Sequence, residues 1–239
     1  MRLQKVDLEK ILFLDIETVP QVYNFSELDE KTAQLYLDKN RYIQERDGLS
    51  NDEIYEKAGV FAEFGKIVCI SCGLVQDKST GNEIRLKSFY GDDEKQLLQD
   101  FAEMLNTHYN TPSHAMCGHN AKEFDFPYIA RRMLINGIDL PEALDIAGKK
   151  PWEINHLDTM ELWKFGDYKH YTSLSLLCQI FNIPTPKDDI SGADVAKVYY
   201  EEKDLERIVA YCHKDVVALI QLFLRFRNEP LVREENINL

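Results

Sequence analysis

Basic side chains and long apolar runs are scarce in this 239-residue sequence, and each shortage excludes a class of protein. Lys and Arg number 28 against 41 Asp and Glu, which leaves a net charge of −13. This sign is wrong for a protein that grips long duplex nucleic acid by its phosphates, so any nucleic-acid contact is expected to be short and local. No window approaches 18 consecutive apolar residues, so we expect no transmembrane helix.

Cysteine is also sparse, and the way it is used indicates the compartment. The five cysteines are an odd number, mostly within apolar segments, which is typical of a reducing cytoplasm. Cys69 and Cys72 have CxxC spacing, but they lie in KIVCISCGLV, whose alternation predicts a strand. Residues three apart on a strand face opposite sides, so this pair is not expected to share a metal. The polar N-terminus is unlike a signal peptide, and we expect a cytoplasmic protein.

The sequence does contain enough apolar residues for a full core, at 44% hydrophobic. Three consecutive predicted strands, followed by helices that alternate with further strands, predict one α/β domain over residues 1–239, built on a mixed five-stranded sheet flanked by helices. A charged stretch at about 26–64 carries helix-capping patterns and is predicted to be a peripheral helical insertion. We expect strands at 11–20, 66–76, 83–90, 115–118 and 154–158, and helices at 93–108, 124–135, 173–183, 191–202 and 204–227.

One short segment, Ile11 to Pro20 (ILFLDIETVP), places two acids at the end of an apolar run. A run of this length predicts a strand buried on both faces. Asp15 and Glu17 are two apart, so both side chains should project from the same side of that strand. Adjacent carboxylates resist joint ionisation unless a positive group lies between them, and a divalent metal would meet that need. Two independent acids at a fraying strand end would produce the same local sequence.

Two distant segments contain further acids. Asp125 stands at a predicted strand-to-helix junction, where capping of the following helix would explain an acid by itself. Tyr211 and Asp215 are four apart in the last predicted helix, so they share a face. That face also carries apolar residues, beside which a lone acid would be costly.

Together, the three segments resemble the three motifs of the DEDDy 3′–5′ exonucleases. The motifs are DIET at 15–18, N-x3-FD at 120–125 and Y-x3-D at 211–215, in the same order. The nearest resemblance is to predicted exonucleases similar to the proofreading domain of family B DNA polymerases. It extends from about Ile11 to Phe226 and includes the segments HLDTMELWKFGDY, TSLSLLC and KDDISGADVAKVYY. This resemblance implies a ribonuclease H-like fold and a stand-alone nuclease.

The resemblance also implies a reaction and a cofactor. The expected activity releases nucleoside 5′-monophosphates from the 3′ end of single-stranded nucleic acid, with DNA favoured over RNA. Two divalent ions, Mg²⁺ or Mn²⁺, would be held by Asp15, Glu17, Asp125 and Asp215. Four carboxylates are the donors that such hard cations prefer. Asp15 would bridge the two ions, and Tyr211 would orient the attacking water.

Residues beside the motifs are expected to contact the substrate. Thr18 and Val19 would lie against the terminal nucleotide, and Asn120 and Phe124 would lie beside the next one. For Phe124, packing in the core explains an aromatic residue as well as base stacking does.

Other polar residues near the motifs are predicted to lie outside the catalytic set. The sister DEDDh group has a histidine five residues before the last aspartate, and Ala210 occupies that position here. His213 is two residues from Asp215 and should point nearly the opposite way. His119 is expected to be structural or to lie beside the substrate and not to act as a base, and Asp158 is expected to support the site without binding metal. A basic and aromatic cluster, explained at least as well by a solvated loop, comprises Lys149, Lys150 and Trp152.

Two alternatives share these residues. A metal-dependent endonuclease on the same kind of sheet would use the carboxylates but would not need Tyr211. A non-catalytic acidic module that binds a protein is permitted by the low pI of about 4.9. Neither the choice between DNA and RNA nor the oligomeric state follows from the sequence.

Overall fold

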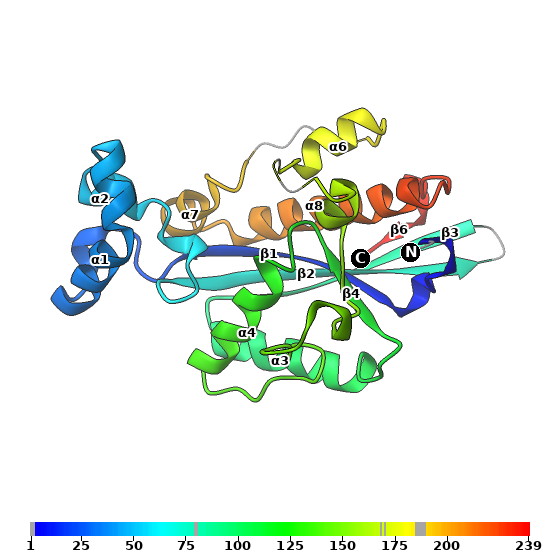
Figure 1. Ribbon diagram of the computed structural model, residues 1–239, viewed down its shortest axis with the longest axis horizontal. Helices are drawn as coiled ribbons and strands as arrows, with labels where there is room; N and C mark the ends of the chain where they lie inside the picture. Colours follow the sequence, from blue (N-terminus) through cyan, green and yellow to red (C-terminus); the bar gives the residue numbers. More distant parts are fainter. Residues whose placement is uncertain (1–2, 79–80, 168, 170, 185–189) are drawn as a thin grey trace.

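The protein is built on one mixed sheet with helices on both faces (Figure 1), seen in a computed structural model that describes residues 3–78, 81–167, 169, 171–184 and 190–239. Within these residues the sheet has six strands in the order β5-β4-β1-β2-β3-β6. The strand bounds are β1 Ile11–Pro20, β2 Gly65–Lys78, β3 Gly81–Tyr90, β4 Ala115–Gly118, β5 Leu157–Asp158 and β6 Ile237–Asn238.

The pairing of the strands confirms the α/β class and corrects the strand count. β1, β2 and β3 form an antiparallel meander, whereas β4 joins β1 in parallel and β5 joins β4 in parallel. The prediction of five strands was wrong, because β6 pairs in parallel with β3 at Ile84 and Arg85. The two residues of β6 are too few to show any alternation, so the sequence pattern did not predict this strand.

The helices form a layer on each face of this sheet. In Figure 1, α8 runs along one face of the central strands, while α3 and α4 lie on the other. No helix in the described part of the chain is long and apolar enough to span a membrane. The helix bounds are α1 Glu30–Asp47, α2 Asn51–Tyr55, α3 Glu94–His108, α4 Asp125–Ile135, α5 Thr159–Lys164, α6 Leu174–Ile180, α7 Val195–Lys197 and α8 Leu205–Phe226, with a π-helix at Val198–Glu202.

Side-chain alternation along β1 explains why the sheet carries two separate cores. Leu12 and Leu14 pack with residues of α3 and α4, whereas Ile11 and Phe13 pack with residues of α8. All four side chains are buried, as expected for a strand covered on both faces. We call these two sides of the sheet the α3–α4 face and the α8 face.

The segment at 26–64 forms α1 and α2 at one end of the molecule (Figure 1). Both helices begin at the caps that the sequence indicates, with the side chains of Asp29 and Ser50 accepting backbone N–H groups. Tyr36 of α1 is fully buried and donates its hydroxyl to the carbonyl of Ile54. Helical period alone underrates a helix whose core contact depends on one large aromatic residue.

A glycine sets the distance between α8 and the sheet. A Cβ atom at Gly73 of β2 would lie 2.7 Å from Ile220 and 2.8 Å from Val216, both on α8. Only glycine therefore lets this helix pack so closely on the strands. Because α8 carries one of the three acidic motifs, this close approach brings that motif towards β1.

Candidate active site

Asp15 and Glu17 stand on the α8 face at the end of β1. They follow Ile11 and Phe13 in the alternation, so all four side chains point to the same side of the sheet. Glu17 is 7% exposed. The register with β2 shifts between Glu17 and Thr18. Such an irregularity marks the point where regular pairing changes and side chains are re-aimed.

Helix α8 brings the third motif to this strand end. Ile208, Cys212 and Val216 lie at helical spacing and are buried against the sheet. Tyr211 and Asp215 occupy the neighbouring stripe and are half-buried. Further along that stripe, Ala218 and Leu222 pack against residues of α6. The polar pair therefore lies at the border between the sheet and α6.

Cys212 contacts the first motif directly, which the sequence did not suggest. Its Sγ atom lies 3.5 Å from both the carbonyl oxygen and Oδ2 of Asp15. The ligand atoms of Asp15, Glu17 and Cys212 all lie within 4.8 Å of one another. The available signal was the helical period, because Cys212 stands midway between the core residues Ile208 and Val216 and must face the strands.

Asp125 is the first residue of α4 and is 4% exposed. The loop before it is held by Asp158, whose two carboxylate oxygens accept the backbone N–H groups of Asn120 (2.9 Å) and Lys122 (3.0 Å). Asp158 also caps α5 by accepting the N–H of Met160 at 2.9 Å. This buried acid thus ties the loop of the second motif to the end of β5, a positioning role that matches its expected support of the site.

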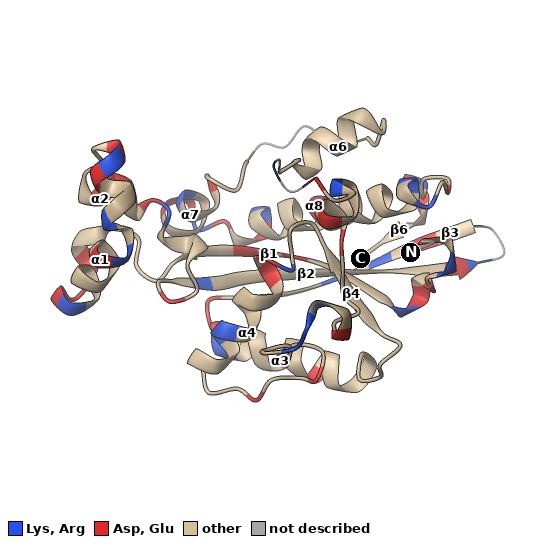
Figure 2. Cartoon of the chain, in the orientation of Figure 1, with Lys and Arg blue, Asp and Glu red and all other residues tan. Residues whose placement is uncertain are grey.

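The acids act on one another electrostatically, which shows that the three motifs converge. Burial raises the pKa of Asp15 well above its usual range, and the negative charges of Asp125 and Asp215 raise it further. Burial and then the charges of Asp15 and Asp215 raise the pKa of Glu17 in the same way. Burial raises the pKa of Asp125 to about 7. These carboxyls come from β1, α4 and α8, and Figure 2 shows acidic positions on all three elements.

Tyr211 lies within the electrostatic field of the same acids. Burial, followed by the charges of Asp215 and Glu17, raises the pKa of its hydroxyl well above the usual value. The hydroxyl therefore stays protonated at neutral pH and can donate a hydrogen bond.

The donor set fits hard divalent cations. Carboxylate oxygens are the ligands that Mg²⁺ and Mn²⁺ prefer, and four carboxyls stand within electrostatic reach of one another here. A bound cation would offset the mutual repulsion that raises their pKa values. Asp15 and Glu17 are the pair whose oxygen atoms converge most closely, together with the Cys212 thiol.

Both histidines near the motifs are held by other groups. His119 bonds through Nδ1 to the hydroxyl of Thr159 and through Nε2 to the carbonyl of Thr172, each at 2.9 Å. His213 Nε2 lies 2.6 Å from the Ser88 hydroxyl on β3. Burial lowers the pKa of both imidazoles.

The residues expected to contact the substrate differ in how far their side chains are exposed. Val19 is fully buried in the core beneath α8, so its side chain presents nothing to a ligand. Thr18 and Asn120 are half-buried, and Asn120 adopts a left-handed backbone with φ of 65°. Phe124 is partly buried against the α3–α4 core and lies 5.4 Å from the ring of Tyr128. In the loop at 149–152, the Lys150 ammonium lies 5.2 Å from the ring centroid of Trp152, which is 78% exposed.

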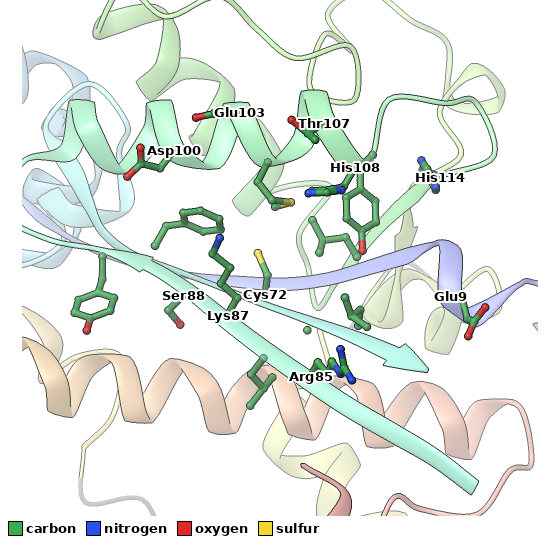
Figure 3. Close-up of a pocket in the computed structure, with 18 residues that line it drawn as sticks. Glu9, Cys72, Arg85, Lys87, Ser88, Asp100, Glu103, Thr107, His108 and His114 are labelled. Carbon is green, nitrogen blue, oxygen red and sulfur yellow. The ribbon is translucent and has the colours of Figure 1, made fainter. Parts of the chain in front are cut away.

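A groove of about 880 Å³ lies on the opposite face of the sheet, between α3 and the strands (Figure 3). Arg85 and Lys87 reach it from β3, while Asp100 and Glu103 reach it from α3. Its charges are mixed, and it contains none of the residues of the three motifs.

Two DNA polymerases are similar to this chain, one in sequence and one in structure. A DNA polymerase from Pyrococcus glycovorans is 23% identical over 233 residues, an alignment that covers 87% of this chain. The chain spans only 29% of the length of that polymerase. The family B DNA polymerase of Pyrobaculum calidifontis superposes with a TM-score of 0.56 at 14% identity, over 90% of this chain and 24% of the polymerase. This likeness shows the fold.

A second solved structure, E. coli exonuclease I in complex with a dT13 oligonucleotide, superposes with a TM-score of 0.40 at 14% identity. It covers 84% of this chain and 42% of the exonuclease.

Residues 60–232, well over half of the chain, match the family described as a predicted 3′–5′ exonuclease related to the exonuclease domain of PolB. The matched range includes Asp125, Tyr211 and Asp215 and begins after β1. The strand β1, which precedes the matched range, places Asp15 and Glu17 beside Cys212 of α8. The chain belongs to this family of predicted exonucleases related to the exonuclease domain of PolB.

Proposed function

We propose that this protein is a metal-dependent 3′–5′ exonuclease that degrades single-stranded nucleic acid, with DNA favoured over RNA, and releases nucleoside 5′-monophosphates. The observation that carries the proposal is the convergence of acids from β1, α4 and α8 around Asp15. Family membership supports the same reaction class. We also propose that residues 1–239 act as one exonuclease domain in the cytoplasm, with α1 and α2 as a peripheral insertion.

Each acid has a distinct proposed role. Two divalent ions, Mg²⁺ or Mn²⁺, would supply charge neutralisation and activation of a water molecule when bound. Asp15 is the ligand proposed to touch both ions, since it adjoins Glu17 and senses the charges of Asp125 and Asp215. Glu17 and Asp215 would complete one site, and Asp125 would complete the other.

Tyr211 is proposed to orient the attacking water and not to act as a base. The raised pKa of its hydroxyl keeps the proton on the oxygen at neutral pH. A protonated phenol can donate a hydrogen bond to the water or to a phosphate oxygen, which positions the attack without removing a proton.

The charge of the protein supports a short substrate contact. A net charge of −13 repels long polyanions, so affinity must arise at one point where cations gather. We propose that the terminal nucleotide lies beside Thr18 and the backbone of Val19, and that the next one lies beside Asn120 and the exposed part of Phe124. A single strand with a free 3′ end can enter such a site without a basic groove.

The test is digestion of a 5′-labelled single-stranded oligonucleotide in the presence of Mn²⁺. The expected result is a ladder that shortens from the 3′ end, seen with DNA and more weakly with RNA of the same sequence. Asp15→Asn should abolish the ladder. No ladder from the wild type, or an undiminished ladder from Asp15→Asn, would contradict the proposal. Cutting of a circular single strand would instead indicate an endonuclease, and absence of Mn²⁺ binding would indicate a non-catalytic module.

A further inference from the structure

A thiol lies where the metal ligands of the proposed nuclease converge. Cys212 directs Sγ at Oδ2 of Asp15 across 3.5 Å, and the carboxylate of Glu17 closes a triangle whose edges are within 4.8 Å. Oxygen-only ligands suit Mg²⁺ and Mn²⁺, whereas a thiolate selects softer cations such as Zn²⁺. The three side chains together offer two hard donors and one soft donor to the same space.

The separation of sulfur and oxygen matches the edge of a tetrahedral zinc site. With Zn–S of about 2.3 Å and Zn–O of about 2.0 Å, tetrahedral angles place the two ligand atoms roughly 3.5 Å apart. The observed distance between Cys212 Sγ and Asp15 Oδ2 is 3.5 Å. An ion could therefore bridge these two atoms without any change in the separation of β1 and α8.

Glu17 places a second carboxylate in this space. Its side chain is buried, with the residue 7% exposed. Two buried carboxylates side by side are costly unless a cation neutralises them. The carboxylate belongs to the same cluster as the Asp15 carboxylate and the Cys212 thiol, so one ion could satisfy all three groups.

Cys72 shows what a buried cysteine does without such neighbours. It lies on β2 with its side chain in the α3–α4 core, 4% exposed and surrounded by apolar residues. Such a cysteine acts as a small hydrophobic residue. Cys212 differs because its thiol contacts a carboxylate, although it is equally buried.

We propose that Cys212 is a third ligand at the Asp15–Glu17 pair, and that the site thereby captures a thiophilic divalent cation, Zn²⁺, in competition with the ions that support catalysis. On coordination the Sγ–H bond breaks, the proton passes to the buffer and the sulfur donates its electron pair to the cation. The inference rests on the proposed metal site of the nuclease and adds a regulation to it: zinc occupies the ligand that both catalytic ions need.

The test uses the folded, metal-free protein and a spectroscopic signal that does not depend on activity. Cd²⁺, a thiophilic probe for zinc sites, should produce a thiolate-to-cadmium charge-transfer band in the ultraviolet for the wild type. Cys212→Ser and Cys212→Ala should both lose this band and lose about tenfold or more in Zn²⁺ affinity, measured by competition with a chromophoric chelator. Their affinity for Mn²⁺ should stay within about threefold of the wild type, because a hard cation gains little from a thiol. Cys72→Ser is the matched control and should behave as the wild type.

The outcomes separate this inference from the proposed function. A band that persists in both Cys212 variants, or no band in the wild type, would overturn the inference. A Cys212-dependent band in a protein that gives no ladder with Mn²⁺ would leave the thiol site standing and remove the nuclease. If the ladder appears, added Zn²⁺ should suppress it in the wild type at about tenfold lower concentration than in Cys212→Ser.

Discussion

Cys69 and Cys72 stand three residues apart on β2, yet they belong to two different chemical environments. Cys69 lies on the α8 face, where Ser71 Oγ is 3.5 Å from its sulfur and Ser71 in turn bonds Ser88 at 2.7 Å. Cys72 lies among apolar side chains on the α3–α4 face, and burial raises the pKa of its thiol. The same strand therefore supplies a polar layer to one face and a hydrophobic layer to the other.

The size of a cavity does not indicate where the reactive groups of this protein lie. The groove on the α3–α4 face is large, at about 880 Å³, but its charges are mixed and do not converge. The α8 face holds acids whose charges raise one another's pKa values. Burying an uncompensated charge costs free energy, so a cluster of buried acids indicates a functional site. A groove carries no such cost and is a weaker indication.

The largest effect is expected from a substitution at the centre of the acid cluster on the α8 face. Asp15→Asn keeps the shape but removes the residue proposed to bind both ions, so nuclease activity should fall about 10³-fold or more. Neutralising one buried acid should also raise the melting temperature of the metal-free protein. Ladder assays and thermal unfolding measure the two effects. Wild-type activity together with a lower melting temperature would mean that the negative charge of Asp15 is neither needed for the reaction nor costly to stability.

The next effect is expected from a substitution on the α3–α4 face, which should reduce stability without reducing catalytic activity. Arg132 and Glu94 form a buried ion pair there, with Nε to Oε1 at 2.8 Å, and Glu94 also accepts the N–H of Ile67 at 2.7 Å. Arg132→Met leaves a buried charge unpaired and should cost about 3–5 kcal/mol of unfolding free energy in urea titrations. Activity per folded molecule should be unchanged.

A matched variant on the same face uses an exposed pair. Arg85 and Glu83 interact at 2.9 Å near solvent, and Arg85→Met should leave the free energy of unfolding nearly unchanged. Similar losses in the two variants would show that burial does not distinguish these ion pairs.

A smaller effect tests the loop that carries Asp125. Asp158→Asn removes one acceptor of the pair that holds the N–H groups of Asn120 and Lys122. Activity should fall about 10- to 100-fold, because the loop and Asp125 lose their support while all four proposed metal ligands remain. Mn²⁺ titration checks the ligands, and an activity equal to the wild type would show that this support is dispensable.

The effect of pH on stability, measured in the presence of a chelator, should distinguish the acids around Asp15 from the apolar core that contains Cys72. Burial raises the folded-state pKa of Asp125 to about 7, so the folded protein holds this proton more tightly than the unfolded chain does. Stability from this group is therefore present below about pH 4 and is lost as pH rises towards 7. Asp125→Asn should reduce this loss in urea titrations between pH 5 and 8, whereas Cys72→Ser should show the wild-type dependence. Identical curves for Asp125→Asn and the wild type would contradict the shift.

The smallest effect concerns the groove. Lys87 lies over the ring of Phe89 at 4.7 Å and lines the groove, on the face of the sheet opposite to Asp15 and Glu17. Lys87→Ala should change the rate of ladder formation by less than about twofold. A large loss would show that the groove takes part in binding the substrate.

Much of the fold was predictable because the local signals agree with the tertiary structure. The hairpin of β2 and β3 was confirmed, as were α3, which is capped by Asp93, and α8, which begins at Asp204. Part of the segment KDDISGADVAKVYY lies outside the described residues, as does Tyr168 at the end of HLDTMELWKFGDY. The helix expected from Ser191 appears instead as α7 followed by a π-helix.

The site was predictable only in part. The alternation of β1 placed Asp15 and Glu17 on one side, and their separation of two residues makes this independent of the rest of the fold. The contact of Cys212 with Asp15 spans 197 positions, and the bonds of Asp158 to the second motif span 36 and 38. No local pattern carries such distances, because they depend on which face α8 covers and on how closely it packs.

By itself, the sequence determined which side chains share a face: Asp15 with Glu17 on a strand, and Tyr211 with Asp215 on a helix. Those relations follow from the periods of two and 3.6 residues, which belong to the backbone alone. That these two faces meet depends on the packing of the whole chain, because Gly73 lets α8 lie against β2 and the parallel pairing of β4 brings Asp125 to the end of β1. Buried charge then follows from the meeting of the elements, since each acid alone would be an ordinary carboxylate.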